Sequence, residues 1–174
     1  MPTFVDALSL EGAVSHRVSG HEHWMLKMND LKVGNRSIKP NVQFALTDTG
    51  TSLIYLDKLD YEAIIHTICK DLACFETEHE KNVFAIRNCE PSQIPTIWVQ
   101  LDLHEYKLAP QAYVVSLVYP DGSHDCIIQF RQNRKEEGFI VLGNLFLMNY
   151  FQVYDVTLNQ LSLTPLNKES SFVG

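Results

Sequence analysis

The sequence predicts a mostly β domain with two short helices, and three observations lead to this class. Most of the chain divides into short runs of β-forming residues bounded by turn residues, and only two segments carry apolar residues at helical spacing. At 174 residues the chain is long enough for one well-packed domain and too short for two of ordinary size. Residues 1–174 are therefore predicted to form a single domain.

The strands are predicted from partial alternation of apolar and polar residues between turns. Asn29-Asp30 and Gly34-Asn35 are predicted turns near the N-terminal end. Pro120-Asp121-Gly122-Ser123 predicts a tight turn, because Pro presets φ and Gly accepts a positive φ, and its flanking strands should form a hairpin. The expected strands are 24–28, 42–46, 96–101, 113–119, 124–130, 139–142, 151–154 and 161–164.

Two helices are predicted. The first covers 57–72, where apolar residues recur at three- and four-residue spacing and Asp57 or Asp60 is suited to cap the start. Its apolar positions are Tyr61, Ile64, Ile65, Ile68 and Leu72. A shorter helix is expected over 144–150, directly after Gly143.

Composition excludes two classes of protein. A formal net charge of −7 argues against a protein that follows nucleic-acid phosphates, which needs clustered Lys and Arg. No apolar run reaches the roughly 20 residues that span a bilayer, so no membrane segment is predicted. Residues 1–6 lack the basic and apolar regions of a signal peptide, which predicts either a cytosolic protein or an internal piece of a longer precursor.

Four cysteines form an even set that is compatible with two disulfides in an oxidising compartment and also with four free thiols. Asn35-Arg36-Ser37 is a glycosylation acceptor pattern, which makes Asn35 a candidate modification site. Such triplets also arise by chance, so this one adds only weakly to a secretory interpretation.

A zinc site is the alternative use of two of these cysteines. His66, Cys69, Cys74 and His79 have a spacing that suits such a site. However, Cys2His2 sites generally need closer cysteine pairing on a turn, and His66 and Cys69 lie inside the predicted helix. His21-Glu22-His23 also offers a possible pair of metal ligands, but a solvated loop or strand edge is the favoured interpretation. No metal or organic cofactor is predicted.

Asp48 is the candidate catalytic residue. It lies in Asp48-Thr49-Gly50-Thr51-Ser52, and apolar residues flank this segment at 44–46 and 53–55. An exposed turn is not usually bracketed by two segments that belong in a core. A carboxylate held between buried strands, with hydroxyl and N–H groups nearby, is typical of an acid with a tuned pKa.

Asp48-Thr49-Gly50-Thr51-Ser52 resembles the active-site loop in the C-terminal lobe of pepsin-like aspartic endopeptidases. About 90 residues later, the segment 139–147 resembles the strand, glycine and helix that pack behind that loop, and 148–155 resembles the strand that completes the lobe. Segments 94–99 and 106–113 also match the family in order and spacing. The resemblance extends from about Trp24 to Leu163 and implies a β lobe of the six-stranded type with short helices, one of the two lobes of the enzyme.

The resemblance implies roles for the loop residues. In the family, one aspartate from each lobe shares a proton and a water, and the resemblance makes Asp48 one of these two. Thr49 would form a hydrogen bond to the loop of the other lobe. Gly50 would let the substrate backbone approach, and Thr51 would bind it through its hydroxyl and backbone.

Further residues are assigned by the same resemblance. Leu46 and Val141 would line apolar pockets for residues after the scissile bond. Ser52, Leu142 and Gly143 would support the loop, as Thr49 does. The family's bridge in this lobe implies a Cys89–Cys126 disulfide and leaves the state of Cys69 and Cys74 open.

The chain has no second Asp-Thr/Ser-Gly and no flap hairpin, so the resemblance predicts half of a site that needs an N-terminal lobe as partner and is inactive alone. A homodimer that joins two copies of Asp48 is a weaker alternative, because single-lobe relatives are much shorter. The alternative from another class is an inactive lobe that binds peptides or proteins. The enzyme interpretation implies peptide cleavage at apolar residues in an extended pose.

Asn144 departs from the family pattern, which commonly has Asp after the glycine, and removing that charge is expected to shift the titration of the site. The implied disulfide and the acceptor triplet favour the secretory pathway, with an extracellular, vacuolar, lysosomal or other acidic vesicular destination.

Overall fold

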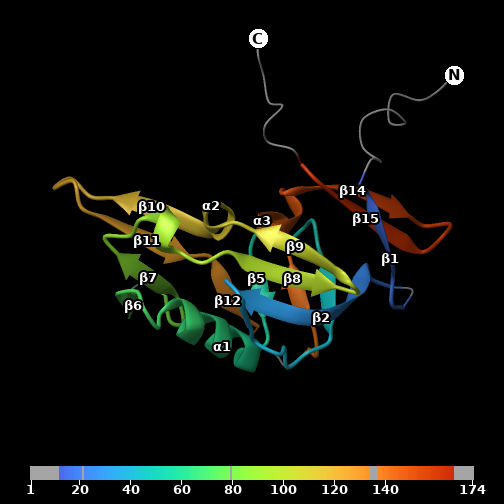
Figure 1. Ribbon diagram of the computed structural model, residues 1–174, viewed down its shortest axis with the longest axis horizontal. Coiled ribbons are helices and arrows are strands. Elements are labelled where there is room, and N and C mark those ends of the chain that lie inside the picture. The colour runs from blue at the N-terminus through green and yellow to red at the C-terminus, as the bar shows by residue number, and fades with distance from the viewer. Residues whose placement is uncertain (1–11, 21, 79, 134–136, 167–174) are drawn as a thin grey trace, which may run out of the picture.

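The computed structural model describes residues 12–20, 22–78, 80–133 and 137–166 (Figure 1). Three sheets form most of this part of the chain, which confirms the mostly β fold with short helices. The bounds of the strands are β1 Val14–Arg17, β2 Met25–Val33, β3 Arg36–Ser37, β4 Phe44–Thr47, β5 Ile54–Leu56, β6 Cys74–Glu76, β7 Phe84–Arg87, β8 Ile97–Leu101, β9 His104–Leu108, β10 Val114–Val118, β11 His124–Ile128, β12 Phe130–Gln132, β13 Ile140–Leu142, β14 Tyr150–Asp155 and β15 Gln160–Pro165.

The largest sheet has the order β12-β5-β13-β4-β2-β8-β9, and β3 pairs with β2 beside this path. The β4–β13 and β12–β5 pairs are parallel, although their partners are distant in sequence. Loops that leave β4 and β13 therefore emerge at the same edge, since the carboxyl ends of parallel strands lie together. This arrangement brings residues after 47 beside residues after 142.

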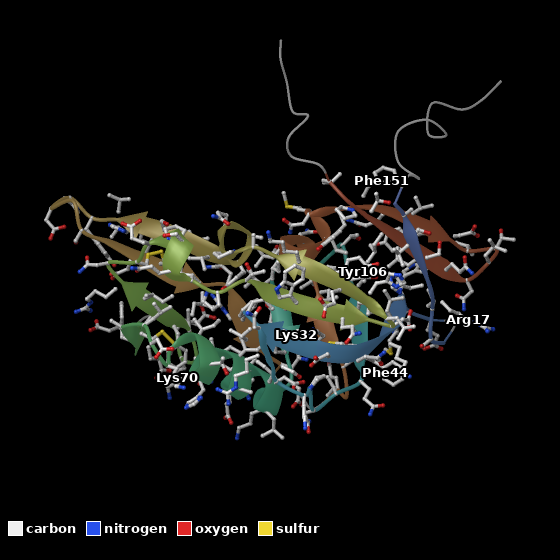
Figure 2. The ribbon with its side chains drawn as sticks, viewed as in Figure 1. Arg17, Lys32, Phe44, Lys70, Tyr106 and Phe151 are labelled. Atoms are coloured by element: carbon white, nitrogen blue, oxygen red, sulfur yellow. A yellow bond between two sulfur atoms is a disulfide. The ribbon has the colours of Figure 1, made fainter. Side chains whose placement is uncertain are left out.

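Two smaller sheets lie at opposite ends of the long axis (Figure 1). One has the order β10-β11-β7-β6 and the other β1-β15-β14. Arg17 on β1 and Phe151 on β14 mark the end occupied by the three-stranded sheet (Figure 2). Both sheets pack against the core, which contains buried residues from all three.

The core continues under helix α1 (Lys58–Ile68), which covers it with Tyr61, Ile64, Ile65 and Ile68. Asp57 caps the helix by accepting the Leu59 N–H at 3.1 Å. Two shorter helices, α2 (Pro110–Tyr113) and α3 (Asn144–Leu147), and the 3-10 helix η1 (Pro91–Gln93) connect strands. No helix in the described ranges is both long and apolar enough to cross a bilayer.

A buried histidine joins the three-stranded sheet to the largest one. The side chain of His16 on β1 is only 1% exposed, and its Nδ1 lies 2.7 Å from Asp102 Oδ2. Its Nε2 is hydrogen-bonded to the hydroxyl of Tyr106 on β9, which is labelled in Figure 2. These contacts satisfy both ring nitrogens, so a polar side chain is accommodated in the core.

Both cysteine pairs form disulfides. Cys89 is joined to Cys126, the pair that the family resemblance implied. Cys69 is joined to Cys74 across the end of α1, which resolves the alternatives that the sequence left open. These two sulfurs are therefore not thiolate ligands, and His21 and His79 lie outside the described residues.

Several element predictions need correction. The predicted turn at Asn29-Asp30 is wrong, because both residues lie within β2, where a register shift against β8 bends the strand. The first helix ends at Ile68 rather than at 72, because Cys69 caps it. The second ends at Leu147, and β14 begins at Tyr150. The Gly34-Asn35 turn and the hairpin at 120–123 are confirmed by the β2–β3 and β10–β11 pairs.

Candidate active site

Asp48 follows β4 directly, near the middle of the largest sheet. β4 lies between β2 and β13, so both neighbours limit its movement. The backbone N–H of Asp48 donates to Leu142 O at 3.2 Å and continues the contact between β4 and β13 by one residue. Thr47, one residue earlier, is buried and donates its hydroxyl to Trp24 O at 3.0 Å. The carboxylate therefore projects from a backbone fixed on both sides.

Both oxygens of the Asp48 carboxylate accept hydrogen bonds from its own loop. Gly50 N–H donates to Oδ1 at 2.8 Å, and Thr51 Oγ1 donates to Oδ2 at 2.5 Å. The Thr51 hydroxyl first, and then the Gly50 N–H, hold the pKa of Asp48 below its usual range, since both bonds favour the charged form. The loop thus orients the Asp48 carboxylate and stabilises its ionised form.

Gly143 makes the close packing behind the loop possible. A Cβ atom built on it would lie 2.2 Å from Leu53 O and 2.4 Å from Thr51 O, which are both backbone atoms. No other residue fits there without displacement of the loop backbone. Gly143 is therefore required by close approach and not by its φ, which at −82° suits any residue.

Backbone groups at the start of α3 hold the loop from behind. Asn144 N–H donates to Thr51 O at 2.7 Å, and Leu145 N–H donates to Ser52 O at 3.1 Å. The Asn144 side chain adds a third bond, from Nδ2 to Thr49 O at 3.2 Å. An ionised Asp at position 144 has no donor for that carbonyl, so the departure from the family pattern corresponds to an additional bond to the loop.

A pocket of about 440 Å³ opens beside the carboxylate. Its lining residues come from β4, from the loop that follows β4, from the segment before β2 and from β14. They are Glu22, His23, Trp24, Leu46, Thr47, Asp48, Thr49 and Tyr154. The pocket thus places two carboxylates, from Asp48 and Glu22, around one opening with the apolar side chain of Leu46 and the rings of Trp24 and Tyr154.

Sequence reasoning had not assigned Trp24 or Tyr154 to this site. Their rings meet edge to face with centroids 4.9 Å apart. Burial raises the pKa of Tyr154; the hydroxyl of Thr47 opposes this rise and the charge of Asp48 adds to it. Both aromatic residues lie within segments that resemble the family, but only the pairing of distant strands brings them beside Asp48.

The structure gathers most of the predicted site residues, although not all at the pocket. Gly50 and Thr51 contact the Asp48 carboxylate, and Thr49 and Leu46 line the pocket. Val141 is paired with Leu46 in the β4–β13 ladder, but it is 9% exposed and does not line the pocket. The other predicted supports, Ser52, Leu142 and Gly143, all form the described backbone contacts to the loop.

A mostly β lobe that presents an Asp-Thr-Gly loop over a strand, a glycine and a short helix defines a pepsin-like acid protease lobe. The chain belongs to the eukaryotic aspartyl protease family, whose family model matches residues 4–166.

Individual relatives agree with this assignment. The chain is 28% identical to pepsin A of Gallus gallus over 86% of its own length and 38% of that protein. It is 28% identical to a probable aspartic-type endopeptidase CTSD of Arthroderma otae, over 88% of the chain and 38% of that protein. It is 25% identical to pregnancy-associated glycoprotein 2 of Bos taurus, over 88% and 41%. The chain therefore spans about two fifths of the length of these relatives.

Proposed function

We propose that this chain is the C-terminal lobe of a two-lobed aspartic endopeptidase and that Asp48 supplies one of the two catalytic carboxylates. The observation that carries the proposal is the hydrogen bonding of Asp48: both oxygens are held by its own loop, and α3 fixes that loop from behind. Catalysis requires this kind of preorganised group, because small errors in position cost rate.

The second carboxylate would come from an N-terminal lobe. The sequence contains a single Asp-Thr/Ser-Gly triplet, and its relatives are more than twice as long. In the assembled site one carboxylate would take a proton from the attacking water while the other, protonated, polarises the scissile carbonyl. Two adjacent carboxylates cannot easily both ionise, so the pair would titrate as a unit. The hydrogen bonds that lower the pKa of Asp48 favour its ionised form, and an ionised carboxylate has no such proton to donate.

We infer that the substrate is a polypeptide bound in an extended pose. Gly50 and Thr51 would contact its backbone, and Thr49 would bond to the loop of the other lobe. Leu46 would offer apolar surface to a residue after the scissile bond, with Val141 supporting it from the neighbouring strand. No metal or organic cofactor takes part in this proposal.

The test compares this chain with the complete two-lobed protein in a peptidase assay at acid pH. The complete protein is expected to cleave an unstructured protein substrate, to lose activity with Asp48→Asn and to be inhibited by a mimic of the tetrahedral intermediate. Asp121→Asn is the matched control, because Asp121 lies in the β10–β11 turn and bonds only to Ser123 among the described residues. This chain alone is expected to be inactive.

Three outcomes would contradict the proposal. Activity of the chain alone that rises linearly with its concentration would show that no second lobe is needed. Activity that rises with the square of concentration would favour a homodimer of two Asp48 loops. A folded two-lobed protein that binds peptides without cleaving them would favour an inactive binding lobe.

We further propose that the protein passes through the secretory pathway and is extracellular or resident in an acidic vesicle, vacuole or lysosome. Two disulfides support an oxidising compartment. Asn35 lies exposed in the β2–β3 turn, where an acceptor asparagine can be reached. Expression in a secreting eukaryotic cell should give a glycan that an endoglycosidase removes and that Asn35→Gln abolishes. An unmodified secreted wild type would exclude Asn35 as an acceptor.

A further inference from the structure

Strand β10 is an unprotected sheet edge. It ends the order β10-β11-β7-β6 and is paired on one side only in the described part of the chain. Three residues of β10 have large, apolar and exposed side chains: Val115 is 47% exposed, Leu117 42% and Val118 76%. Tyr119, which follows the strand, is 42% exposed. Proteins usually blunt such edges with charges, prolines or bulges, because a free edge is a template for another strand.

The hydrogen bonds of the β10–β11 hairpin show which backbone groups face outward. Gln129 N–H donates to Tyr113 O at 2.8 Å, and Tyr119 N–H donates to Ser123 O at 2.8 Å. Bonding alternates along an antiparallel pair, so Val115 and Leu117 also bond to β11. The backbone groups of Ser116 and Val118 consequently point away from the sheet.

The charge pattern restricts what can pair with this edge. The protein carries a net charge of −7, yet no residue from Leu108 to Pro120 is charged. An acidic or basic strand would find no partner charge here, whereas a second copy of β10 brings only uncharged side chains together. Two acidic molecules can therefore approach at this edge without placing like charges opposite each other.

We propose that β10 is a homodimer interface, in which two copies pair antiparallel about a twofold axis at Ser116. In that register Ser116 faces the partner's Ser116, Val118 faces the partner's Val114, and Leu117 faces the partner's Val115. The outward N–H and C=O of Ser116 then bond to the partner's Ser116, and Val118 N–H donates to the partner's Val114 O; Val114 N–H takes no part, since it already donates to Pro110 O. The two four-stranded sheets join into one, and the twofold contact closes so that a dimer forms and not a fibre.

This interface is separate from the proposed active site. The Asp48 loop belongs to the largest sheet, and the residues that line its pocket include none from β10. Five residues per copy form a small contact compared with the roughly 1,200–2,000 Å² of stable complexes. The dimer is therefore expected to be weak and to appear only as concentration rises.

The test introduces a charge at Ser116, which lies on the proposed twofold axis, and measures dimerisation by sedimentation velocity over a dilution series. The wild-type chain should shift reversibly between monomer and dimer. Ser116→Lys and Ser116→Asp should each weaken dimerisation roughly fivefold or more, because like charges then face each other directly. An equal mixture of the two variants should recover the dimer. Leu103→Lys is the matched control, since Leu103 is 82% exposed in the β8–β9 turn.

Amide hydrogen exchange of the wild-type chain gives a second measurement, which does not depend on the stability of the variants. On dimerisation the amides of Ser116 and Val118 should gain protection, whereas those of Val115 and Leu117 are already protected. A wild type that stays monomeric throughout overturns the proposal, as does a dimer that Ser116→Lys leaves intact. A dimer that dissociates when the N-terminal lobe is added would assign the edge to that lobe, and larger open assemblies would exclude the twofold contact.

Discussion

Replacement of Gly143 by Ala is expected to disturb both the fold and the candidate active site. The new Cβ would lie 2.2 Å from Leu53 O and 2.4 Å from Thr51 O, whereas ordinary contact begins near 3.4 Å. The backbone must therefore move by about 1 Å, and both obstacles are main-chain carbonyls that have no rotamer to change. Overpacking of this kind costs about 1–3 kcal/mol.

The displacement also lengthens the bonds from Asn144 N–H to Thr51 O and from Leu145 N–H to Ser52 O. Each contributes about 1 kcal/mol, so the total loss in the free energy of unfolding is about 3–5 kcal/mol. Because Thr51 holds Asp48 Oδ2, its movement should also return the pKa of Asp48 toward its ordinary value.

Urea unfolding measures the first effect, and carboxyl NMR titration measures the second. Gly122→Ala is the control: a Cβ there meets no atom within 4 Å, but φ is +85°, so the expected cost is about 1–2 kcal/mol of backbone strain. The reasoning is refuted if Gly143→Ala costs no more than Gly122→Ala, or if the pKa of Asp48 stays unchanged in a variant that folds.

Three further predictions concern the loop, a buried acid and the disulfides. Thr51→Val should raise the pKa of Asp48 in the same NMR titration, because it removes the larger of the two bonds that lower it, and an unchanged pKa would contradict this assignment. Burial raises the pKa of Asp60 in the folded protein. Its protonation therefore stabilises the fold fully below the pKa of the unfolded chain, and this stabilisation is lost as pH rises through the folded pKa. Asp60→Asn should remove this pH dependence from the free energy of unfolding, measured with urea across acid pH. Loss of the Cys89–Cys126 bridge, with a separation of 37 residues, should cost about 4 kcal/mol, against about 2 kcal/mol for Cys69–Cys74 with a separation of 5, and equal costs of the two double Cys→Ala variants would contradict the chain-entropy argument.

The local pattern of apolar and polar residues was sufficient to predict elements whose side chains alternate regularly or follow a helical period. The helix face from Tyr61 to Ile68 and the hairpin at 120–123 are determined by nearby residues, and both are present. β1 was missed because its buried position is His16, which no hydrophobic pattern marks. Its burial depends on Asp102 and Tyr106, which are far away in the sequence.

The sequence by itself determined the family and the identity of the candidate carboxylate, because the Asp48 loop and the segments that support it have fixed residue types at fixed spacing. Only the tertiary structure placed Trp24 and Tyr154 beside that carboxylate and gave Asn144 a bond to the loop. The reason is that β4 pairs with β13 across about 90 residues, so the surroundings of Asp48 come from strands that no local pattern connects. The same holds for β10, because only the order of its sheet shows that, among the residues that the structure describes, it is paired on one side.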